Sequence, residues 1–268
     1  MKCAFCLLLV LPSMAQQGAN VYSMEKERAL GQQYAAEIRR QSKPLDNPEV
    51  EAYVRRIGEK LVAQLKDPRF EYRFETITDN SWTEPLSLPG GYVFIPAGAF
   101  VAAQDEAEFA GMLAHSIGHV ALRHGRRPTV QGQITNRASV PLVFMGGWNG
   151  LHADSRRQQT SMPAGFLEFQ RTYELEADSF GVELAARAGY DPAAFERYID
   201  RTQSADTNPS PLPERELRLA RLQEMVASLP SSSPSSDDQE FRRIQEITRS
   251  TRTVTPRLDS PPRRGGRE

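Results

Sequence analysis

The sequence predicts an α+β domain that is mostly helical and carries a small β-sheet. Several long segments repeat apolar residues three and four positions apart, which is the spacing of one face of an α-helix. Two shorter segments have strand patterns instead. Phe70, Tyr72 and Phe74 alternate with charged residues, as in a strand with one solvated face. The apolar run 92–95 follows a Leu-Pro-Gly-Gly turn and is the second predicted strand.

Two helices are expected ahead of the strands. The first runs from Ser23, a typical capping residue, to about Gln41. The second begins at Asn47-Pro48, a cap followed by a first-turn proline, and ends before Asp67-Pro68. Both expected helices therefore come before both expected strands in the first hundred residues.

The second half of the sequence is dominated by helical patterns. One helix is expected over 105–123, the strongest over 166–188, another reaching about Gln203, and a last one over 213–227. The intervening stretch 129–163 holds a short apolar patch and a glycine-rich run. It fits either a flexible cover over a cleft or a plain surface loop with one buried anchor.

Composition divides the chain into three parts. Residues 1–15 look like a secretory signal peptide, with Lys2 ahead of a short apolar run and small residues before a cleavage point. Residues 23–228 are expected to form the folded domain. Residues 229–268 are rich in Ser, Pro and Arg and are expected to be a disordered tail, with a short helix at 241–247 as one option.

Charge and cysteine content exclude several classes of partner and ligand. The formal net charge is −1, so neither nucleic acid nor an anionic membrane surface is an expected partner. No segment approaches about eighteen consecutive apolar residues, so no membrane span is expected. Both cysteines, Cys3 and Cys6, lie in the signal-like segment. A mature chain would therefore have neither disulfides nor thiolate metal ligands.

His115 and His119 are the most informative residues. They are four positions apart, so a helix places both imidazoles on one face, where they can bind one zinc ion. The helical zinc-protease motif H-E-x-x-H has a glutamate general base directly after the first histidine. Ser116 stands at that position here. The sequence thus predicts a metal site that lacks the usual base.

Glu174 on a separate helix is the candidate third ligand. Two imidazoles and one carboxylate would hold one zinc ion and leave its fourth position open for water or substrate. Asp178 lies one helical turn beyond Glu174 and is expected to orient a ligand histidine. The predicted site is therefore His115, His119 and Glu174, with Asp178 behind it.

The remaining histidines and the neighbouring acid are expected to lie outside the site. His124 is about 180° around the helix from His115, and Glu176 points about 200° away from Glu174. His124 is therefore interpreted as structural. His152 lies in the stretch 129–163 and is either a mobile ligand or an exposed residue.

Taken together, these motifs resemble the gluzincin metallopeptidases, the family of the CAAX prenyl protease, HtpX and the periplasmic BepA-like enzymes. The matching runs are Leu-Pro-Gly-Gly-Tyr at 88–92, Glu-Ala-Glu at 106–108, the histidine motif at 115–120, Arg123-His124, and Arg171 with 174–178. Their order and spacing agree over roughly residues 25–222.

The resemblance implies a zincin-like metallopeptidase domain with Glu174 as the third zinc ligand. It also implies that Tyr92 to Ile95 is an edge strand beside the zinc helix, along which a protein or peptide substrate would pair by strand addition. Because no membrane span is expected, the chain is similar to the secreted, periplasmic branch. The implied function is hydrolysis of peptide bonds in cell-envelope proteins.

Two positions depart from the family pattern. Ser116 replaces the glutamate that takes a proton from the attacking water, and losing a general base costs about 10² to 10⁴ in rate. Asn208 stands where relatives often have a histidine ahead of a Glu-Arg pair, here Glu214-Arg215, and an amide cannot titrate. No substitute base is evident, since Glu108 lies about two helical turns from His115.

Three functions are consistent with these residues. The first is a zinc metalloendopeptidase that is impaired because Ser116 replaces the base. The second is a zinc-binding pseudopeptidase that binds peptides or envelope proteins without cleaving them. The third is a metal-free helical interaction module. Intact ligands favour the first two functions, and Ser116 favours the second.

Overall fold

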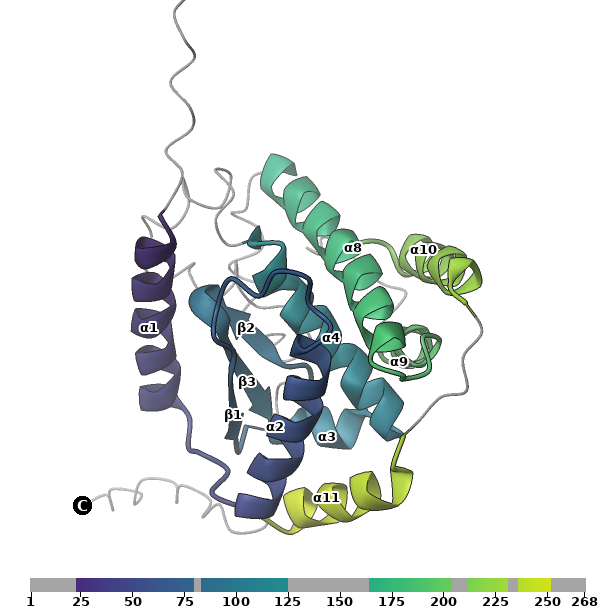
Figure 1. Ribbon diagram of the computed structural model, residues 1–268. Helices are drawn as coiled ribbons and strands as arrows, with labels where there is room; N and C mark the ends of the chain where they lie inside the picture. The colour runs from purple at the N-terminus through teal and green to yellow at the C-terminus, as the bar shows by residue number, and fades with distance from the viewer. Residues whose placement is uncertain (1–22, 80–82, 125–163, 204–211, 231–235, 252–268) are drawn as a thin grey trace, which may run out of the picture.

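The computed structural model describes residues 23–79, 83–124, 164–203, 212–230 and 236–251, with the side chains of 164–169 left aside. Within these ranges a small sheet is surrounded by helices (Figure 1), and helix α1 stands along one side of the sheet while α4 and α8 lie on the other. The predicted α+β class is confirmed.

The first two helices begin at the predicted caps. Helix α1 spans Met24–Gln41, and the Ser23 hydroxyl accepts a hydrogen bond from the backbone N–H of Lys26. Helix α2 spans Pro48–Val62, and Asn47 Oδ1 accepts from two backbone N–H groups of its first turn. These bonds satisfy donors that a helix start leaves without an intrahelical partner.

The sheet has three strands among the described residues. Strand β1 (Arg73–Ile77) pairs parallel with β3 (Tyr92–Pro96), and β2 (Leu86–Leu88) pairs antiparallel with the other side of β3. The strand order is therefore β1-β3-β2. Strand β1 begins three residues after Phe70, so the alternating pattern of the sequence marks the strand but not its start.

The expectation that Tyr92 to Ile95 is an edge strand is wrong. Its backbone pairs on both sides, and all five residues of β3 are buried. The cause is the short 3-10 turn η1 (Pro89–Gly91), where Gly90 and Gly91 have φ of 79° and 97°. These angles suit glycine and fold β2 back onto β3. Strands β1 and β2 are thus the outer strands of the described sheet.

Helix α4 (Glu106–Ala121) forms the centre of the fold. Nearly all of its residues are buried, and it packs against α8 (Ala164–Arg187), α9 (Ala194–Thr202), α2 and β2. Its first turn is capped by Asp105, whose side chain accepts from the backbone N–H of Glu108 at 2.7 Å. A helix buried on every side occupies the core of a domain, so the motif that it carries is held rigidly.

The expectation that 229–268 is a disordered tail is wrong for part of that segment. After α10 (Arg215–Ser228), helix α11 (Asp238–Thr251) packs against α2 and against the short helix α3 (Ala97–Ala102). Phe241 and Ile244 are fully buried, and Gln245 Nε2 donates to the carbonyls of Phe100 and Ala103 at 2.7 and 2.8 Å. The helix is therefore part of the core, although a Ser/Pro-rich segment precedes it.

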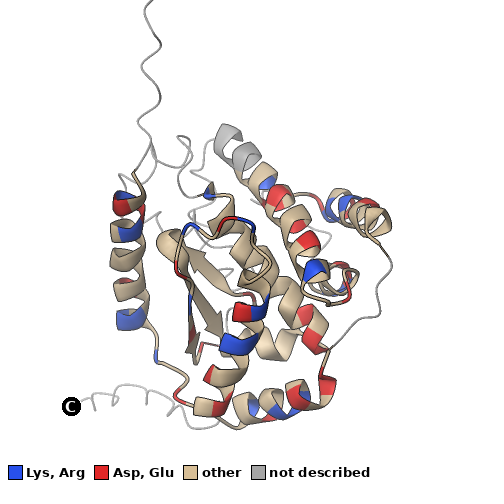
Figure 2. Ribbon diagram, in the orientation of Figure 1, with Lys and Arg blue, Asp and Glu red and all other residues tan. Residues whose placement is uncertain are grey.

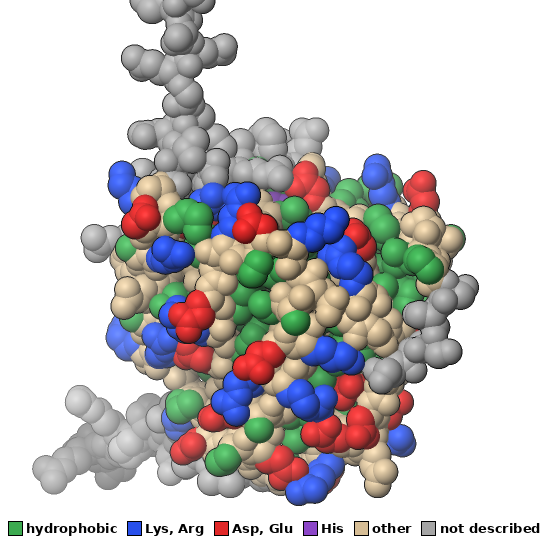
Figure 3. Space-filling view, viewed as in Figure 1, with side chains coloured by type: hydrophobic (Ala, Val, Ile, Leu, Met, Phe, Trp, Pro, Cys, Tyr) green, Lys and Arg blue, Asp and Glu red, His purple; other side chains and the backbone are tan. Residues whose placement is uncertain are grey.

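The surface carries charges of both signs. Basic and acidic residues are interspersed along α1 and α11 (Figure 2), and the face shown in Figure 3 has neither sign in excess over a large area. Among the described residues, no helix is long and apolar enough to cross a membrane. The predicted signal peptide 1–15, the stretch 129–163 with His152, and Asn208 lie outside the described residues.

Candidate metal centre

Close packing of α4 on α8 brings the predicted ligands together. A Cβ at Gly181 would lie 2.7 Å from the backbone nitrogen of His115, and a Cβ at Gly118 would lie 3.2 Å from the carbonyl oxygen of Ala177. These glycines let the two helix backbones approach more closely than larger residues would. The approach places Glu174 on α8 opposite the histidines on α4.

Three donor atoms converge at this helix contact. The Nε2 atoms of His115 and His119 are 3.1 Å apart, and the Glu174 oxygens lie 3.4 Å from His115 Nε2 and 3.6 Å from His119 Nε2. One ligand atom from each residue lies within 4.8 Å of the others. This group could therefore hold a metal ion.

The donor set fits zinc. Glu174 Oε2 is buried and has no hydrogen-bond partner of good geometry, which is costly for a carboxylate unless a cation compensates it. The Nε2 atoms of His115 and His119 face each other at 3.1 Å, so at most one of them carries a proton. Two imidazoles and one carboxylate are a common set for a catalytic zinc with an open position. Thus the orphaned oxygen and the donor chemistry both match a divalent cation.

Asp178 holds one ligand histidine from behind. Its Oδ1 lies 2.8 Å from His115 Nδ1, which leaves Nε2 facing Glu174. Both Asp178 oxygens also accept hydrogen bonds from Arg218 of α10, at 2.6 and 2.7 Å. Burial alone would raise the pKa of Asp178, but Arg218 outweighs burial and lowers it. The carboxylate stays charged and orients the imidazole.

The same contacts set the protonation of the metal-free histidine. Burial alone would lower the pKa of His115, but the nearby carboxylates of Asp178 and Glu174 outweigh burial and raise it to about 9. Burial likewise opposes ionisation of Glu174, yet His119 and His115 hold the pKa of its carboxyl well below the usual range. In the metal-free protein a proton on His115 therefore compensates part of the negative charge around it, and a metal ion that binds there must displace this proton.

His124 contacts the site in a way that the helical angle does not predict. Its Nδ1 lies 3.0 Å from His119 Nδ1, and its Nε2 lies 3.1 Å from Glu176 Oε2. The expected opposite orientation is wrong because α4 ends at Ala121 and Arg123 has a φ of 56°, which turns the chain back. His124 thus supports His119 much as Asp178 supports His115, and Glu176 supports His124.

Ser116 occupies the general-base position, but its hydroxyl is already engaged in a hydrogen bond to the backbone. It is 1% exposed, and its hydroxyl donates to the carbonyl of Pro85, the residue before β2, at 3.1 Å. Glu108 does not replace the base either. It accepts a hydrogen bond from the backbone N–H of Gln104 at 2.9 Å and forms an ion pair with Arg201.

Two further residues near the site have no motif in the sequence. Arg218 is 1% exposed and links Asp178 to Gln203, whose Oε1 accepts from Arg218 at 3.1 Å. Glu84 is a buried acid that interacts electrostatically with Arg218, His115 and Glu174. Arg218 lies in a helix with several arginines, and Glu84 precedes a turn, so the sequence gives no reason to single out either.

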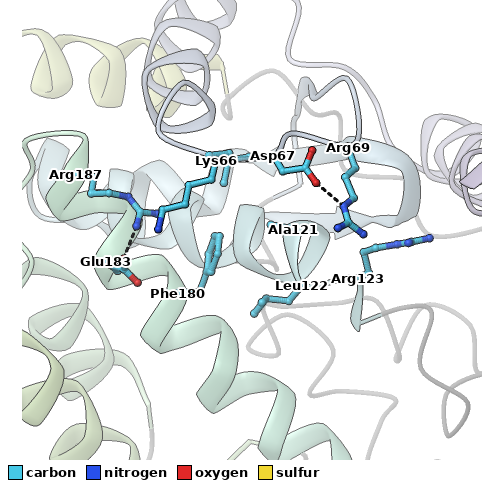
Figure 4. A pocket seen from close by; sticks show the side chains of 10 residues that line it. Lys66, Asp67, Arg69, Ala121, Leu122, Arg123, Phe180, Glu183 and Arg187 are labelled. Atoms are coloured by element: carbon cyan, nitrogen blue, oxygen red, sulfur yellow. Dashed lines mark hydrogen bonds and ion pairs between the residues drawn. The ribbon is translucent and has the colours of Figure 1, made fainter.

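A cavity of about 570 Å³ lies beside the C-terminal end of α4, and it is separate from the candidate metal centre. Figure 4 shows its lining, with ion pairs joining Arg187 to Glu183 and Arg69 to Asp67. None of the three candidate ligands lines this cavity. The convergent donors are therefore not part of this depression.

Comparison with known proteins agrees with the site. Residues 48–249, three quarters of the chain, match Peptidase family M48. The chain belongs to this family. It is 26% identical to the beta-barrel assembly-enhancing protease of Escherichia coli over 79% of the chain and 46% of that protein, and 26% identical to that of Yersinia pestis over 88% and 51%. It is 27% identical to the mitochondrial metalloendopeptidase OMA1 of Schizosaccharomyces pombe over 58% and 44%.

Membership of family M48 accounts for the main features of the site. Metallopeptidases of this family use zinc, and the helix pair α4 and α8 presents a group that could hold it. The match runs through α11, in agreement with the buried position of that helix. The chain spans about half the length of the bacterial relatives that it matches.

Proposed function

We propose that this chain is a zinc metalloendopeptidase homologue that acts on proteins of the cell envelope and that hydrolyses peptide bonds slowly. The convergence of His115, His119 and Glu174, with a buried glutamate oxygen that lacks a hydrogen-bond partner, carries the proposal. One zinc ion bound there would polarise the peptide carbonyl and acidify the attacking water. The relatives named as beta-barrel assembly-enhancing proteases support an envelope substrate, and the signal-like residues 1–15 support export to the periplasm.

The residues of the chain divide the work around that ion. Asp178 and Arg218 fix the ring of His115, and His124 with Glu176 fixes the ring of His119. Glu174 and His119 have side chains that are 12% and 13% exposed, so the ligand group is reached from solvent on their side. A substrate enters from there, whereas pairing along Tyr92 to Ile95 is excluded because both sides of β3 are occupied.

Ser116 accounts for the proposed low rate. A neutral hydroxyl that already donates to the Pro85 carbonyl cannot take a proton from water at pH 7. The loss of a positioned base lowers the rate by about 10² to 10⁴. The ligands do not depend on this residue, so zinc binding is retained.

A paired measurement tests the function. The zinc content and the cleavage of unfolded casein are measured for the wild-type protein and for Ser116→Glu, with and without a chelator. We expect near one equivalent of zinc in both, weak chelator-sensitive cleavage by the wild type, and stronger cleavage by Ser116→Glu. A control, Ser116→Ala, removes only the hydrogen bond to Pro85 and costs about 1 kcal/mol of stability.

The outcomes separate the alternatives. Protein that purifies without zinc and takes none up would contradict the metal site and leave the helical interaction module. Zinc without any cleavage by the wild type would favour the pseudopeptidase, for which the serine at position 116 is the specific observation. Zinc-loaded Ser116→Glu that folds but cleaves no faster would show that the serine is not the limiting defect.

A further inference from the structure

The outer edge of β1 lies in a second cavity, of about 680 Å³. One wall is the C-terminal end of α1, with Arg39 and Ser42, and the other is the exposed side of α2. Residues 72–77 line the cavity between these two helices (Figure 1). We call this cavity the β1 groove. It is separate from the candidate metal centre, because α4 packs against β2, at the other edge of the described sheet.

The backbone of β1 is only partly paired at its outer edge. The carbonyl of Thr76 accepts a hydrogen bond from the N–H of Leu45 at 2.9 Å. The N–H of Thr78 donates to the carbonyl of Lys43, also at 2.9 Å. Every second residue of a strand directs its backbone groups to the same edge, so those of Phe74 point this way too. Among the described residues, neither the N–H nor the C=O of Phe74 has a backbone partner at this edge.

The segment that pairs with the far end of β1 turns away before it reaches Phe74. The N–H of Asn47 donates to the carbonyl of Leu45 at 2.9 Å, and α2 begins at Pro48. The ladder that this segment starts is therefore left incomplete inside the groove. An unpaired strand edge can take up the backbone of another extended segment, and the hydrogen bonds of the ladder then contribute to binding.

The α2 wall of the groove carries charges of alternating sign. Glu51, Arg55 and Glu59 are exposed and line the groove at every fourth position of the helix. No ion pair is found for these three among the described residues, and the pairs between α2 and α11 involve Glu49 and Arg56 instead. Four residues of a helix rise about 6 Å, and two residues of a strand about 6.6 Å. An added strand can therefore place one side chain opposite each of the three charges.

The side of β1 that faces α2 is aromatic. The rings of Tyr72 and Phe74 are stacked, with centroids 6.4 Å apart, and both residues are half-buried. A Cβ at Gly58 of α2 would lie 2.4 Å from the Phe74 ring, so this ring is directed toward α2. Glu75 is directed to the other face, where Arg39 Nε donates to it at 2.8 Å. Long charged side chains of an added strand can thus lay their aliphatic parts on the two rings and reach α2 with their ends.

We propose that the β1 groove binds an extended segment of a partner protein by strand addition, and that this segment carries basic, acidic and basic side chains at alternate positions. The backbone of Phe74 supplies ladder hydrogen bonds, and the three charges of α2 supply ion pairs. A second copy of the chain fits less well, because its β1 offers the uncharged Tyr72, Phe74 and Thr76 on this face. The site is additional to the metal centre and needs no metal ion.

Peptide binding in chelator tests the proposal, because neither zinc nor cleavage then contributes. The probe is the fluorescently labelled peptide Thr-Lys-Val-Glu-Val-Lys-Thr, and its affinity is measured by anisotropy. We expect the charge-reversed peptide, with Glu, Lys and Glu at the same positions, to bind at least about tenfold more weakly, since one exposed ion pair contributes up to about fivefold. Methylation of the backbone nitrogens along one edge of the peptide should abolish binding, and methylation along the other edge should not.

The substitution Arg55→Glu reverses the central charge of the α2 wall. We expect it to weaken binding of the first peptide by about fivefold or more. It should bind more tightly a peptide in which lysine replaces the central glutamate, and this recovery shows that the variant folds. Arg221→Glu, at an exposed site on α10, is the matched control and should change neither affinity. Hydrogen exchange of the Phe74 amide should slow when the first peptide is bound.

Contrary outcomes concern this site alone. No binding at millimolar peptide, or equal binding of the two methylated peptides, overturns strand addition at β1. Equal affinities of the wild type and Arg55→Glu for every peptide overturn the proposed charge pattern. A dimer in sedimentation whose Phe74 amide is protected without peptide shows that a second copy occupies the edge, and it overturns the proposed partner. Each of these results leaves the proposed peptidase function in place, because all are obtained without metal.

Discussion

Removal of Arg218 should destabilise the protein more than any exposed ion pair would suggest. The guanidinium is 1% exposed and donates two hydrogen bonds to Asp178, which is 2% exposed, and a third to Gln203. Arg218→Met keeps most of the volume but removes the guanidinium that contacts both oxygens of a buried carboxylate. Breaking one side of such a pair costs about 3 to 5 kcal/mol.

The assay is urea unfolding in the presence of a chelator, so that the ion pair is measured without metal. Arg215→Met is the control on the same helix. Arg215 pairs with the largely exposed Asp200, and this pair should contribute less than about 1 kcal/mol. In the double variant Arg218→Met/Asp178→Asn neither charge remains, so we expect part of the lost stability to return.

The substitution Arg218→Met should also change the affinity for zinc. Because Asp178 orients His115, a misplaced carboxylate should weaken zinc binding about 10- to 100-fold, measured by competition with a chelating dye. A loss of stability no greater than that of Arg215→Met would refute the reasoning, because Arg218 would then not compensate the buried charge.

Two further predictions follow from the described contacts. Phe241→Ala should lower the free energy of unfolding by about 3 to 5 kcal/mol, because its ring is fully buried against the core; a change below about 1 kcal/mol in urea unfolding would show that α11 is dispensable. In chelator, His115 should make the protein less stable at high pH. Its folded pKa of about 9 lies above the ordinary 6.5, so its contribution is complete below pH 6.5 and is lost as pH rises toward 9. Urea midpoints at these two pH values test this, and His115→Gln should remove the difference; a wild-type midpoint that is unchanged or higher at pH 9 would contradict it.

The sequence supports the local parts of the fold well. The caps at Ser23, Asn47 and Asp105 start helices as expected, because capping involves residues three or fewer positions apart. The histidine pair shares a helix face for the same reason. That Glu174 lies opposite these residues was also predicted, since the choice of third ligand rested on donor chemistry rather than on topology.

The parts that the sequence did not predict depend on long-range contacts. The order of the strands is decided by pairing partners, so the pattern of Tyr92 to Ile95 cannot show whether one or both sides are occupied. The prediction that His124 points away from the site assumed that the helix continues to residue 124. The left-handed backbone of Arg123 ends that regular geometry and turns His124 toward His119. Arg218 is one of several arginines on its helix, and only the tertiary packing shows which one is buried.

The two helices that supply the ligands also give the metal a mechanical consequence. His119 and Glu174 are 55 positions apart in the chain, so an ion bound between α4 and α8 acts as a crosslink that closes a long loop. Such a clip restricts the unfolded chain, and the restriction grows with the length of the loop that it closes. Loss of the cation would therefore weaken the contact between α4 and α8 and lower the stability of the whole domain.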